Sequence, residues 1–194
     1  MDIFQILVFE HALIREYLQL LEGAIDQLRN GRRPPLEFFH KAARFGREFV
    51  GTYHHIKEED HVFAFLAQKN AGLYEESIAH LRAEHDQGGE ALVEISSSLL
   101  AYSRGDEDAA LHIERSLAGY VAMLTHHVFE EDHVFFPAVQ RELTEEERDY
   151  LFMVFQQEFD KAGQDAVEQY SEVLRQMGVL LRESAGAELV GRAG

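Results

Sequence analysis

Apolar residues recur at spacings of three and four along most of the chain, with few interruptions. This spacing is the period of an α-helix, whereas a half-buried strand would alternate apolar and polar residues. Glycine, proline and polar residues break the pattern at four places, residues 31–35, 70–72, 104–106 and 137–144. Short connections between long helices favour antiparallel neighbours. We therefore expect an all-α fold, an up-down-up-down four-helix bundle.

The residues after the fourth helix predict an additional C-terminal helix. Thr144 and Glu147 have the spacing of a capping box, in which each side chain binds the backbone N–H of the other residue. From this start we expect one helix that ends at about Arg182. The expected organisation is a bundle domain over residues 1–143, the additional helix over 144–183 and a flexible tail over 184–194.

Composition limits both the chemistry and the partners of the chain. The 194 residues suffice for one domain with a hydrophobic core, and none of them is cysteine. Disulfides, thiolate metal sites and cysteine nucleophiles are therefore excluded, so that a metal ion would bind only nitrogen and oxygen atoms. The formal net charge of −17 repels nucleic acids and anionic membranes. Residues 1–9 lack the features of a signal peptide, and we expect a cytoplasmic protein.

An eleven-residue segment of the expected second helix recurs in the fourth. Residues 53–63 read YHHIKEEDHVF and residues 125–135 read THHVFEEDHVF, and eight of the eleven positions are identical. The first and third helices share a shorter Glu-His pair, at residues 10–11 and 84–85. The sequence thus predicts a two-fold arrangement, in which the first pair of helices corresponds to the second pair.

Several histidines and glutamates lie on the inner faces of the expected helices. Residues four apart share one face of a helix, so that a histidine and a glutamate at this spacing point to one place. In the fourth helix His127 and Glu131 lie within or at the edge of the apolar stripe. His85 lies near the middle of the stripe of the third helix, and His11 lies at the edge of the stripe of the first.

The second helix does not decide between two registers. One pair at the required spacing is His54 and Glu58, and the other is His55 and Glu59. Neither pair lies squarely within the main apolar stripe of this helix. Periodicity alone therefore leaves both pairs open.

These inward side chains together predict a metal site. A charged carboxylate beside an imidazole in a bundle core costs several kcal/mol unless a cation compensates the charge. Neutral imidazole is the commonest metal ligand in proteins, and the chain has eleven histidines. Two histidine–glutamate pairs on alternate helices, with one inward histidine on each of the other helices, favour a cation over a separate structural role for every residue.

The pattern resembles the hemerythrin-like HHE cation-binding family, whose members are non-haem di-iron four-helix bundles. The resemblance covers about residues 1–140 and rests on the Glu-His pairs, on His-x-x-x-Glu in the second and fourth helices, and on Phe-Phe-Pro at 135–137. It implies six metal ligands: His11, His54, Glu58, His85, His127 and Glu131. It also implies two iron ions bridged by oxide or hydroxide, with manganese and zinc as alternatives for these ligand types.

The resemblance further implies a protein that binds or senses dioxygen, nitric oxide or peroxide, or takes part in iron handling. Leu81 stands where oxygen-carrying hemerythrins have a further histidine, which argues against simple oxygen transport. Asp132 is an alternative ligand to Glu131, because it follows His127 by five residues as in the oxygen carriers. The sequence leaves open the physiological ligand, the oligomeric state and whether the protein is an enzyme.

Two other functions fit parts of the sequence. A ferritin-like di-iron oxidase or peroxidase would use the Glu-x-x-His motifs at residues 58–61 and 130–133, with Glu10 and Glu84 as its single glutamates. Phe-Phe-Pro and the outward position of residues 130 and 133 favour the HHE family over it. The second alternative is a metal-free interaction protein that uses the C-terminal helix. Four histidines have no assigned role: His61, His80, His126 and His133.

Overall fold

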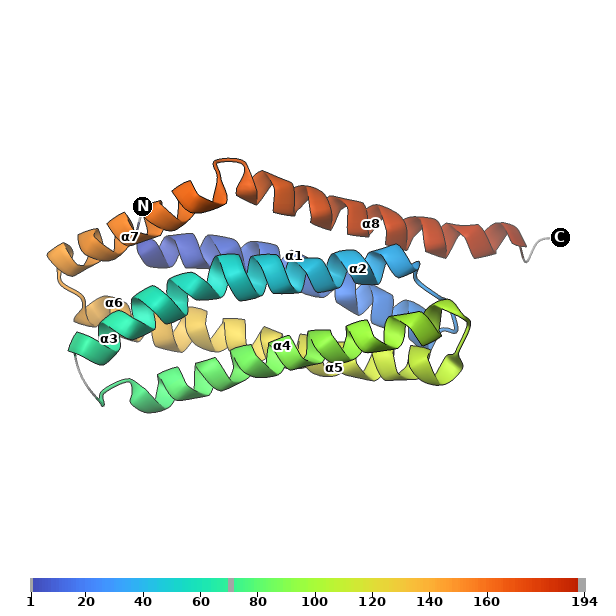
Figure 1. The fold of residues 1–194 in the computed structure, drawn as a ribbon, viewed down its shortest axis with the longest axis horizontal. Helices are drawn as coiled ribbons and strands as arrows, with labels where there is room; N and C mark the ends of the chain where they lie inside the picture. The colour runs from blue at the N-terminus through green and yellow to red at the C-terminus, as the bar shows by residue number, and fades with distance from the viewer. Residues whose placement is uncertain (1, 70–71, 192–194) are drawn as a thin grey trace.

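Four long antiparallel helical rods form the body of the molecule (Figure 1). The structure is a computed structural model that describes residues 2–69 and 72–191, with side chains as far as residue 185. The first rod is α1 (Ile3–Arg29) and the third is α4 (Glu75–Ser103). The prediction of an all-α four-helix bundle is confirmed.

The second and fourth rods each consist of several consecutive helical segments. The second rod comprises α2 (Leu36–Phe45), η1 (Gly46–His54), η2 (Lys57–Phe63) and α3 (Ala64–Lys69). The fourth rod comprises α5 (Glu107–Glu130), η3 (Glu131–Phe135) and α6 (Phe136–Glu142). The first rod packs beside the fourth, the fourth beside the third and the third beside the second, so that the four rods enclose a common interior.

The rods end near the breaks that the sequence predicts. Gly31 and Gly105 follow α1 and α4 with φ angles of 72° and 88°, a backbone conformation that residues with a Cβ atom rarely adopt. The side chain of Asp106 accepts a hydrogen bond of 2.9 Å from the backbone N–H of Ala109 and so caps the start of α5. These local signals set the lengths of the rods.

The second and fourth rods contain π-helical turns, which are wider than those of an α-helix. In η1 the backbone N–H of His55 donates to the carbonyl of Val50, five residues earlier. In η3 the N–H of Phe136 donates to the carbonyl of Glu131, directly before Pro137, which has no N–H to continue the α pattern. In an α-helix, residues four apart drift around the axis by about 40° per step, and wider turns cancel this drift.

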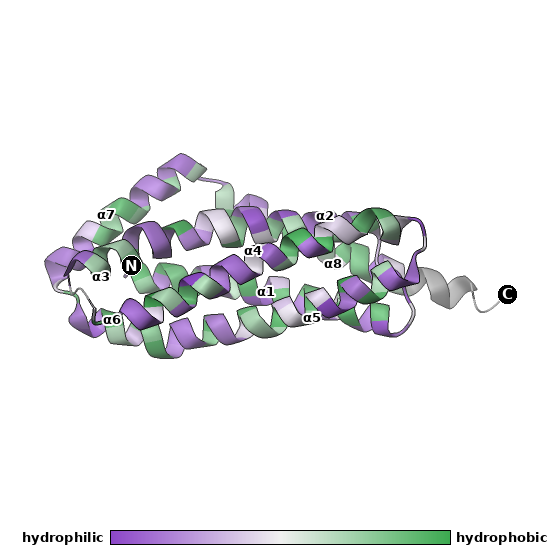
Figure 2. Ribbon diagram, turned by 60° about the horizontal axis from the view of Figure 1, so that its bottom comes forward, coloured by the Kyte–Doolittle hydropathy of each residue, from purple (hydrophilic) through white to green (hydrophobic). Residues whose placement is uncertain are grey.

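The interior consists of two apolar clusters with a polar layer between them. One cluster surrounds Phe45, Tyr17 and Leu117, and the other surrounds Phe4, Phe63 and Val139 near the ends of the rods. Figure 2 shows apolar and hydrophilic residues interspersed along the rods. The polar layer is buried as fully as the apolar residues around it: Glu10, His11, His54, Glu58, His127 and Glu131 are each 1% exposed or less.

Two further helices cover one side of the bundle, α7 (Glu145–Ala162) and α8 (Ala166–Gly191). The capping box of Thr144 and Glu147 is present, but the single helix predicted to reach Arg182 is wrong. The helix is broken at Gly163, whose φ of 91° does not fit a continuing helix. α8 then extends to Gly191, past the expected start of the tail at residue 184, and residues 192–194 lie outside the described residues.

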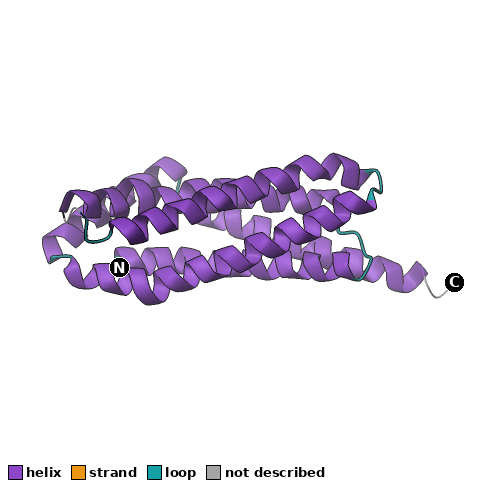
Figure 3. Cartoon of the chain, turned by 90° about the horizontal axis from the view of Figure 1, so that it is seen from below, coloured by secondary structure: helices purple, strands orange, loops and turns teal. Residues whose placement is uncertain are grey.

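The described residues form helices, turns and loops, and no strand occurs among them (Figure 3). α8 packs against α1 and α2, and α7 packs against η2. None of the helices in this part of the chain is both long and apolar enough to cross a membrane.

Candidate metal centre

Side chains from all four rods meet in the polar layer. Nε2 of His11 lies 3.0 Å from Nε2 of His54. Glu58 and Glu131 complete this group, with carboxylate oxygens 3.2 Å from the Nε2 atoms of His54 and His11 respectively. We call these two histidines with the two glutamates the first half-site.

A second group of the same composition lies next to the first. Nε2 of His85 lies 3.1 Å from Nε2 of His127. Glu58 Oε2 lies 3.6 Å from His85 Nε2, and Glu131 Oε2 lies 3.3 Å from His127 Nε2. We call this group the second half-site, and Glu58 and Glu131 are shared by both. The structure thus brings together all six side chains that the sequence singled out.

A carboxylate binds the outer nitrogen of each of the four imidazoles. The Nδ1 pairs are His11–Asp132 at 2.8 Å, His54–Glu10 at 2.9 Å, His85–Glu59 at 2.6 Å and His127–Glu84 at 2.9 Å. Because a carboxylate accepts the hydrogen bond, each Nδ1 carries a proton, and each Nε2 faces the centre, where it presents a lone pair to a metal ion once any second proton has left the ring. Such carboxylate–histidine pairs are typical of metal ligands.

The two carboxylates that face the centre have no hydrogen-bond partner among the described residues. Both oxygens of Glu58 and both oxygens of Glu131 are buried in this state. Two ligand atoms about 3 Å apart can both bind one metal ion that lies about 2.1 Å from each of them. Two buried carboxylates without hydrogen-bond partners would repel each other, and positive charge beside them, on protonated imidazoles or on a metal ion, removes this repulsion. The residues present therefore fit a metal.

The net charge of the polar layer also favours a bound cation. Six carboxylates surround the centre: Glu10, Glu58, Glu59, Glu84, Glu131 and Asp132. Three basic side chains pair with them: Arg15 with Asp132, Lys57 with Glu10, and Arg82 with Glu59. The excess of negative charge in a buried layer is compatible with bound divalent cations.

The excess negative charge shifts the pKa of the ring nitrogens. Burial lowers the pKa of His54, but the charge of Glu58 and the hydrogen bond to Glu10 raise it more, to about 10. Carboxylate neighbours also raise the pKa of His11 and of His127 against the effect of burial. A metal ion competes with these protons for the same nitrogen atoms.

The wider turns select the register that periodicity left open. Four residues at intervals of four are buried in line: Val50, His54, Glu58 and Val62. In a strict α-helix this line would drift out of the core, which is why neither candidate pair matched the apolar stripe. His54 and Glu58 therefore face the centre, whereas Glu59 binds Nδ1 of His85 instead.

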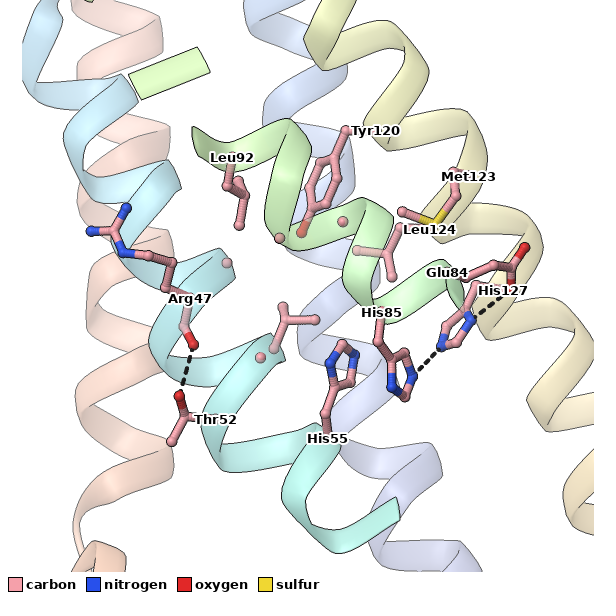
Figure 4. A pocket seen from close by; sticks show the side chains of 15 residues that line it. Arg47, Thr52, His55, Glu84, His85, Leu92, Tyr120, Met123, Leu124 and His127 are labelled. Atoms are coloured by element: carbon pink, nitrogen blue, oxygen red, sulfur yellow. Dashed lines mark hydrogen bonds and ion pairs between the residues drawn. The ribbon is translucent and has the colours of Figure 1, made fainter. Parts of the chain in front are cut away.

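His55 also lies beside the second half-site, although it does not share the line of His54. A ring nitrogen of His55 lies within 4.8 Å of the facing atoms of Glu58, His85 and His127. Figure 4 shows its ring beside His85, and His85 beside His127. Burial and the neighbouring His85 keep the pKa of His55 well below its usual range, so that this imidazole is neutral.

The remaining histidines lie away from the centre. His61 binds Glu158 of α7 at 3.0 Å, and Nδ1 of His133 binds the carbonyl of Phe129. His80 and His126 are more than half exposed on the bundle surface. The structure therefore does not bring the two Glu-x-x-His motifs of a ferritin-like centre together.

Asp132, Glu10 and Glu84 have positions that the sequence interpretation missed, because it treated them as alternative ligands. Each instead holds the outer nitrogen of a histidine. The repeated Glu-His pair at residues 10–11 and 84–85 was the available signal for two of these contacts. No local pattern indicates that Lys57, within the repeat, is buried against Glu10.

Comparison with known protein families matches residues 2–139 to the hemerythrin HHE cation-binding domain. The chain belongs to the hemerythrin HHE cation-binding family. The resemblance seen in the sequence is thereby confirmed, and the matched residues include all four rods as far as α6. No solved structure matches the chain significantly.

Similar proteins of known sequence include two from mycobacteria. The uncharacterized proteins Rv1995 of Mycobacterium tuberculosis and Mb2018 of Mycobacterium bovis are 26% identical to this HHE-family chain over 178 residues. In both comparisons the alignment covers 89% of this chain and 69% of the relative. It is therefore longer than the family match and includes residues of the covering helices.

Proposed function

We propose that this protein is a hemerythrin-like non-haem di-iron protein that binds or senses a small ligand, namely dioxygen, nitric oxide or peroxide. The observation that carries the proposal is the pairing of four Nε2 atoms around two shared, unsatisfied carboxylates. His11 and His54 would hold one ion, His85 and His127 the other, and Glu58 and Glu131 would contact both. Imidazole and carboxylate together suit iron, although manganese and zinc accept the same ligands.

Two ferrous ions at this position would supply electrons and open coordination positions for such a ligand. Residues of the chain orient the ligands and control their surroundings. The outer carboxylates hold the imidazole rings in one orientation and keep the protons on Nδ1. The two apolar clusters exclude water from the two sides of the layer that they cover, which strengthens the electrostatic contacts there. Reversible ligand binding fits this arrangement better than turnover. Among the described residues beside the facing atoms, His55 is the one buried acid or base that holds no other side chain in place.

The first test is metal content and spectra. Protein reconstituted with ferrous iron in the absence of oxygen should hold two ions per chain, and its optical spectrum should change on exposure to air or nitric oxide. Glu131→Gln should lose iron, because the amide removes a charge that both ions need. Glu130→Gln is the matched control, since the neighbouring Glu130 is partly exposed and lies outside the centre. Iron-free protein under these conditions, or equal iron in both variants, would contradict the proposal.

A second test separates this centre from the ferritin-like alternative. Replacing His61 and His133 together with alanine removes the histidines of both Glu-x-x-His motifs. We expect the double variant to keep two ions, because His61 binds Glu158 and His133 lies near the surface. Loss of both ions would favour the ferritin-like arrangement.

A further inference from the structure

A second group of metal-ligating side chains lies on the surface of α4 and α5, outside the polar layer. His80 and Glu84 of α4 and Glu130 of α5 each offer one atom, and the three atoms lie within 4.8 Å of one another. Nε2 of His80 lies 3.6 Å from Glu84 Oε1 and 3.6 Å from Glu130 Oε2. Nδ1 of His126 lies 3.9 Å from the same oxygen of Glu130. We call these four side chains the outer cluster.

The separations within the outer cluster fit ligands of a single cation. Ligand atoms about 2.1 Å from a tetrahedral ion lie about 3.4 Å from one another. The side chains of His80 and His126 are more than half exposed, so that both can turn toward a common ion. Imidazole and carboxylate together suit zinc and other divalent transition metals, whereas calcium and magnesium prefer oxygen ligands. The ligand types therefore indicate the class of cation.

The carboxylates of the outer cluster also favour a cation by their charge. Oε2 of Glu84 accepts a hydrogen bond of 2.9 Å from His127, and its other oxygen faces His80. Glu130 faces the imidazoles of His80 and His126. Within the described part of the chain, neither carboxylate forms an ion pair with a lysine or an arginine. A divalent cation would supply positive charge at this place.

The corresponding place beside the first half-site contains an ammonium group. Glu10 corresponds to Glu84, because each directly precedes a histidine of the centre. Lys57 corresponds to Glu130, because each lies three residues after a histidine that faces the centre. Nζ of Lys57 is buried and lies 3.0 Å from Oε1 of Glu10. The chain thus supplies its own cation to one outer carboxylate and places a second carboxylate beside the other.

The two histidines of the outer cluster likewise have no counterpart beside the first half-site. His80 corresponds to Ile6, five residues before the histidine of its rod, and His126 corresponds to Tyr53, directly before the histidine of its rod. Ile6 is buried, and the ring of Tyr53 lies 3.4 Å from Nζ of Lys57. Three of the four positions therefore differ, and each difference introduces a metal-ligating side chain into the outer cluster.

Solvent reaches the outer cluster, whereas protein covers its counterpart. The ring of Phe159 in α7 lies 5.3 Å from Nζ of Lys57, and α4 and α5 lie on the side of the bundle away from α7 and α8 (Figure 1). A cavity of about 320 Å³ beside the second half-site includes Glu84 in its lining and reaches the surface. Residues 88–89, which line it, are glycines where the first rod has larger side chains at residues 14–15.

We propose that the four side chains of the outer cluster bind one divalent transition-metal cation, of the class of zinc, at the surface of the bundle. On Glu84 this cation takes the place that the ammonium group of Lys57 takes on Glu10. Oε1 of Glu84 faces the cation, and Oε2 keeps its hydrogen bond to His127. Because the cluster is exposed, its cation exchanges with the solvent. The site does not depend on the proposed di-iron function.

Zinc is a suitable probe of the outer cluster. The iron-loaded full-length chain is dialysed to equilibrium against zinc chloride over a range of concentrations, and zinc and iron per chain are then measured. Dialysis replaces desalting, because an exposed site loses its cation when free zinc is removed. Iron is measured in every sample, since zinc that displaces iron raises one content and lowers the other. The wild type should bind one zinc ion with no change in iron.

Variants of the outer cluster should lose this zinc ion and keep the iron. Loss of an outer partner of a ligand weakens metal binding by about 10–100-fold, and loss of a direct ligand should cost at least as much. We therefore expect His80→Ala and Glu130→Gln each to weaken zinc binding by about tenfold or more. His126→Ala should also weaken it. His112→Ala is the matched control, because His112 is exposed on the same helix α5 and lies outside the outer cluster.

The outcomes separate this site from the proposed centre. Equal zinc affinity in the wild type, His80→Ala and Glu130→Gln would overturn the outer site. Equal weakening in His112→Ala would show nonspecific binding to exposed histidines and would overturn it as well. Wild-type affinity in His126→Ala would overturn the assignment of a fourth ligand. A wild type that lacks iron but binds one zinc ion more than His80→Ala would support the outer site and overturn the proposed function.

Discussion

The two half-sites contain the same residue types in different surroundings. At the first, the outer carboxylate Glu10 is 1% exposed and pairs with Lys57, whose side chain is fully buried. At the second, the corresponding Glu84 is 13% exposed and faces His80, which is itself about half exposed. One half-site is therefore enclosed by protein, and the other lies beside a cavity that reaches the surface.

This difference shows that the facing histidines and glutamates, and the access of solvent to them, depend on different parts of the sequence. Each rod places one histidine at the centre, but His54 and Glu58 are offset by one position within the repeat from His127 and Glu131, which face the centre from the fourth rod. The neighbours that do not repeat, Lys57 on one side and Gly88 with Gly89 on the other, decide which half-site is closed. Near symmetry in the facing side chains is thus compatible with different roles for the two half-sites.

The largest difference in stability between matched variants of the two half-sites should appear when the buried ammonium group of Lys57 is removed. Lys57→Met leaves Glu10 as an unpaired charge in the core, and breaking a buried ion pair costs about 3–5 kcal/mol. His80→Leu, the matched change near Glu84, should alter the free energy of unfolding by less than about 0.5 kcal/mol, because the group is exposed. Urea unfolding of both variants measures this, and equal losses would show that the half-sites are not differently buried.

Metal removal should have the second largest effect on stability. A ligand present at a hundredfold excess over its dissociation constant stabilises the folded state by about 2.7 kcal/mol, and for a chain of this length that corresponds to roughly 5–11 °C in Tm. We expect calorimetry to show this loss after chelation. If the centre holds two iron ions as proposed, iron release to a chelator should occur in two phases, with the ion of the second half-site leaving first. One phase, or an unchanged Tm, would argue against two unlike metal sites.

Replacing the outer carboxylates Glu10 and Glu84 should weaken metal binding by different amounts. Loss of such a partner usually weakens metal binding by about 10–100-fold. We expect Glu10→Gln to lie near about 100-fold, because it also leaves Lys57 without its carboxylate, and Glu84→Gln near about tenfold. Competition with a chelator of known affinity measures both. A larger effect for Glu84→Gln would reverse the assignment of the closed half-site.

The smallest effect concerns the arginines at the outside of the layer. Arg15 pairs with Asp132, whose side chain is 7% exposed, whereas Arg82 pairs at 3.7 Å with Glu59, whose side chain is 33% exposed. Arg15→Gln should reduce stability by about 1 kcal/mol and Arg82→Gln by about 0.2 kcal/mol, the range of partly and fully solvated ion pairs. Thermal unfolding of the iron-free variants resolves this pair, and a larger effect for Arg82→Gln would contradict the difference in burial.

Much of the fold could be predicted because its signals are local. Glycine and proline breaks between periodic segments located the ends of the rods, and the Thr144 capping box located the start of α7. The break at Gly163 was missed because a lone glycine within an amphipathic pattern has the same local signature whether the helix continues or ends. Only packing of α7 and α8 on different parts of the bundle distinguishes the two cases.

Prediction of the candidate site from the sequence was limited for a different reason. His127 and Glu131 followed from the apolar stripe of their helix, because η3 begins only at Glu131. His54 and Glu58 lie within or beside π-helical turns, and a calculation that assumes 3.6 residues per turn misplaces them. The cavity depends on the absence of side chains, which no motif search detects. Only the comparison of residues 14–15 with residues 88–89 reveals it.

The π-helical turns of the second rod also determine which changes of chain length the protein tolerates. Each wide turn accommodates extra backbone between the apolar cluster around Phe45 and the facing pair His54 and Glu58. A one-residue deletion in this stretch would rotate every later side chain by about 100°. The deletion would leave composition and charge almost unchanged and would still empty the centre, so that this segment is more sensitive to the number of its residues than to the identity of most of them.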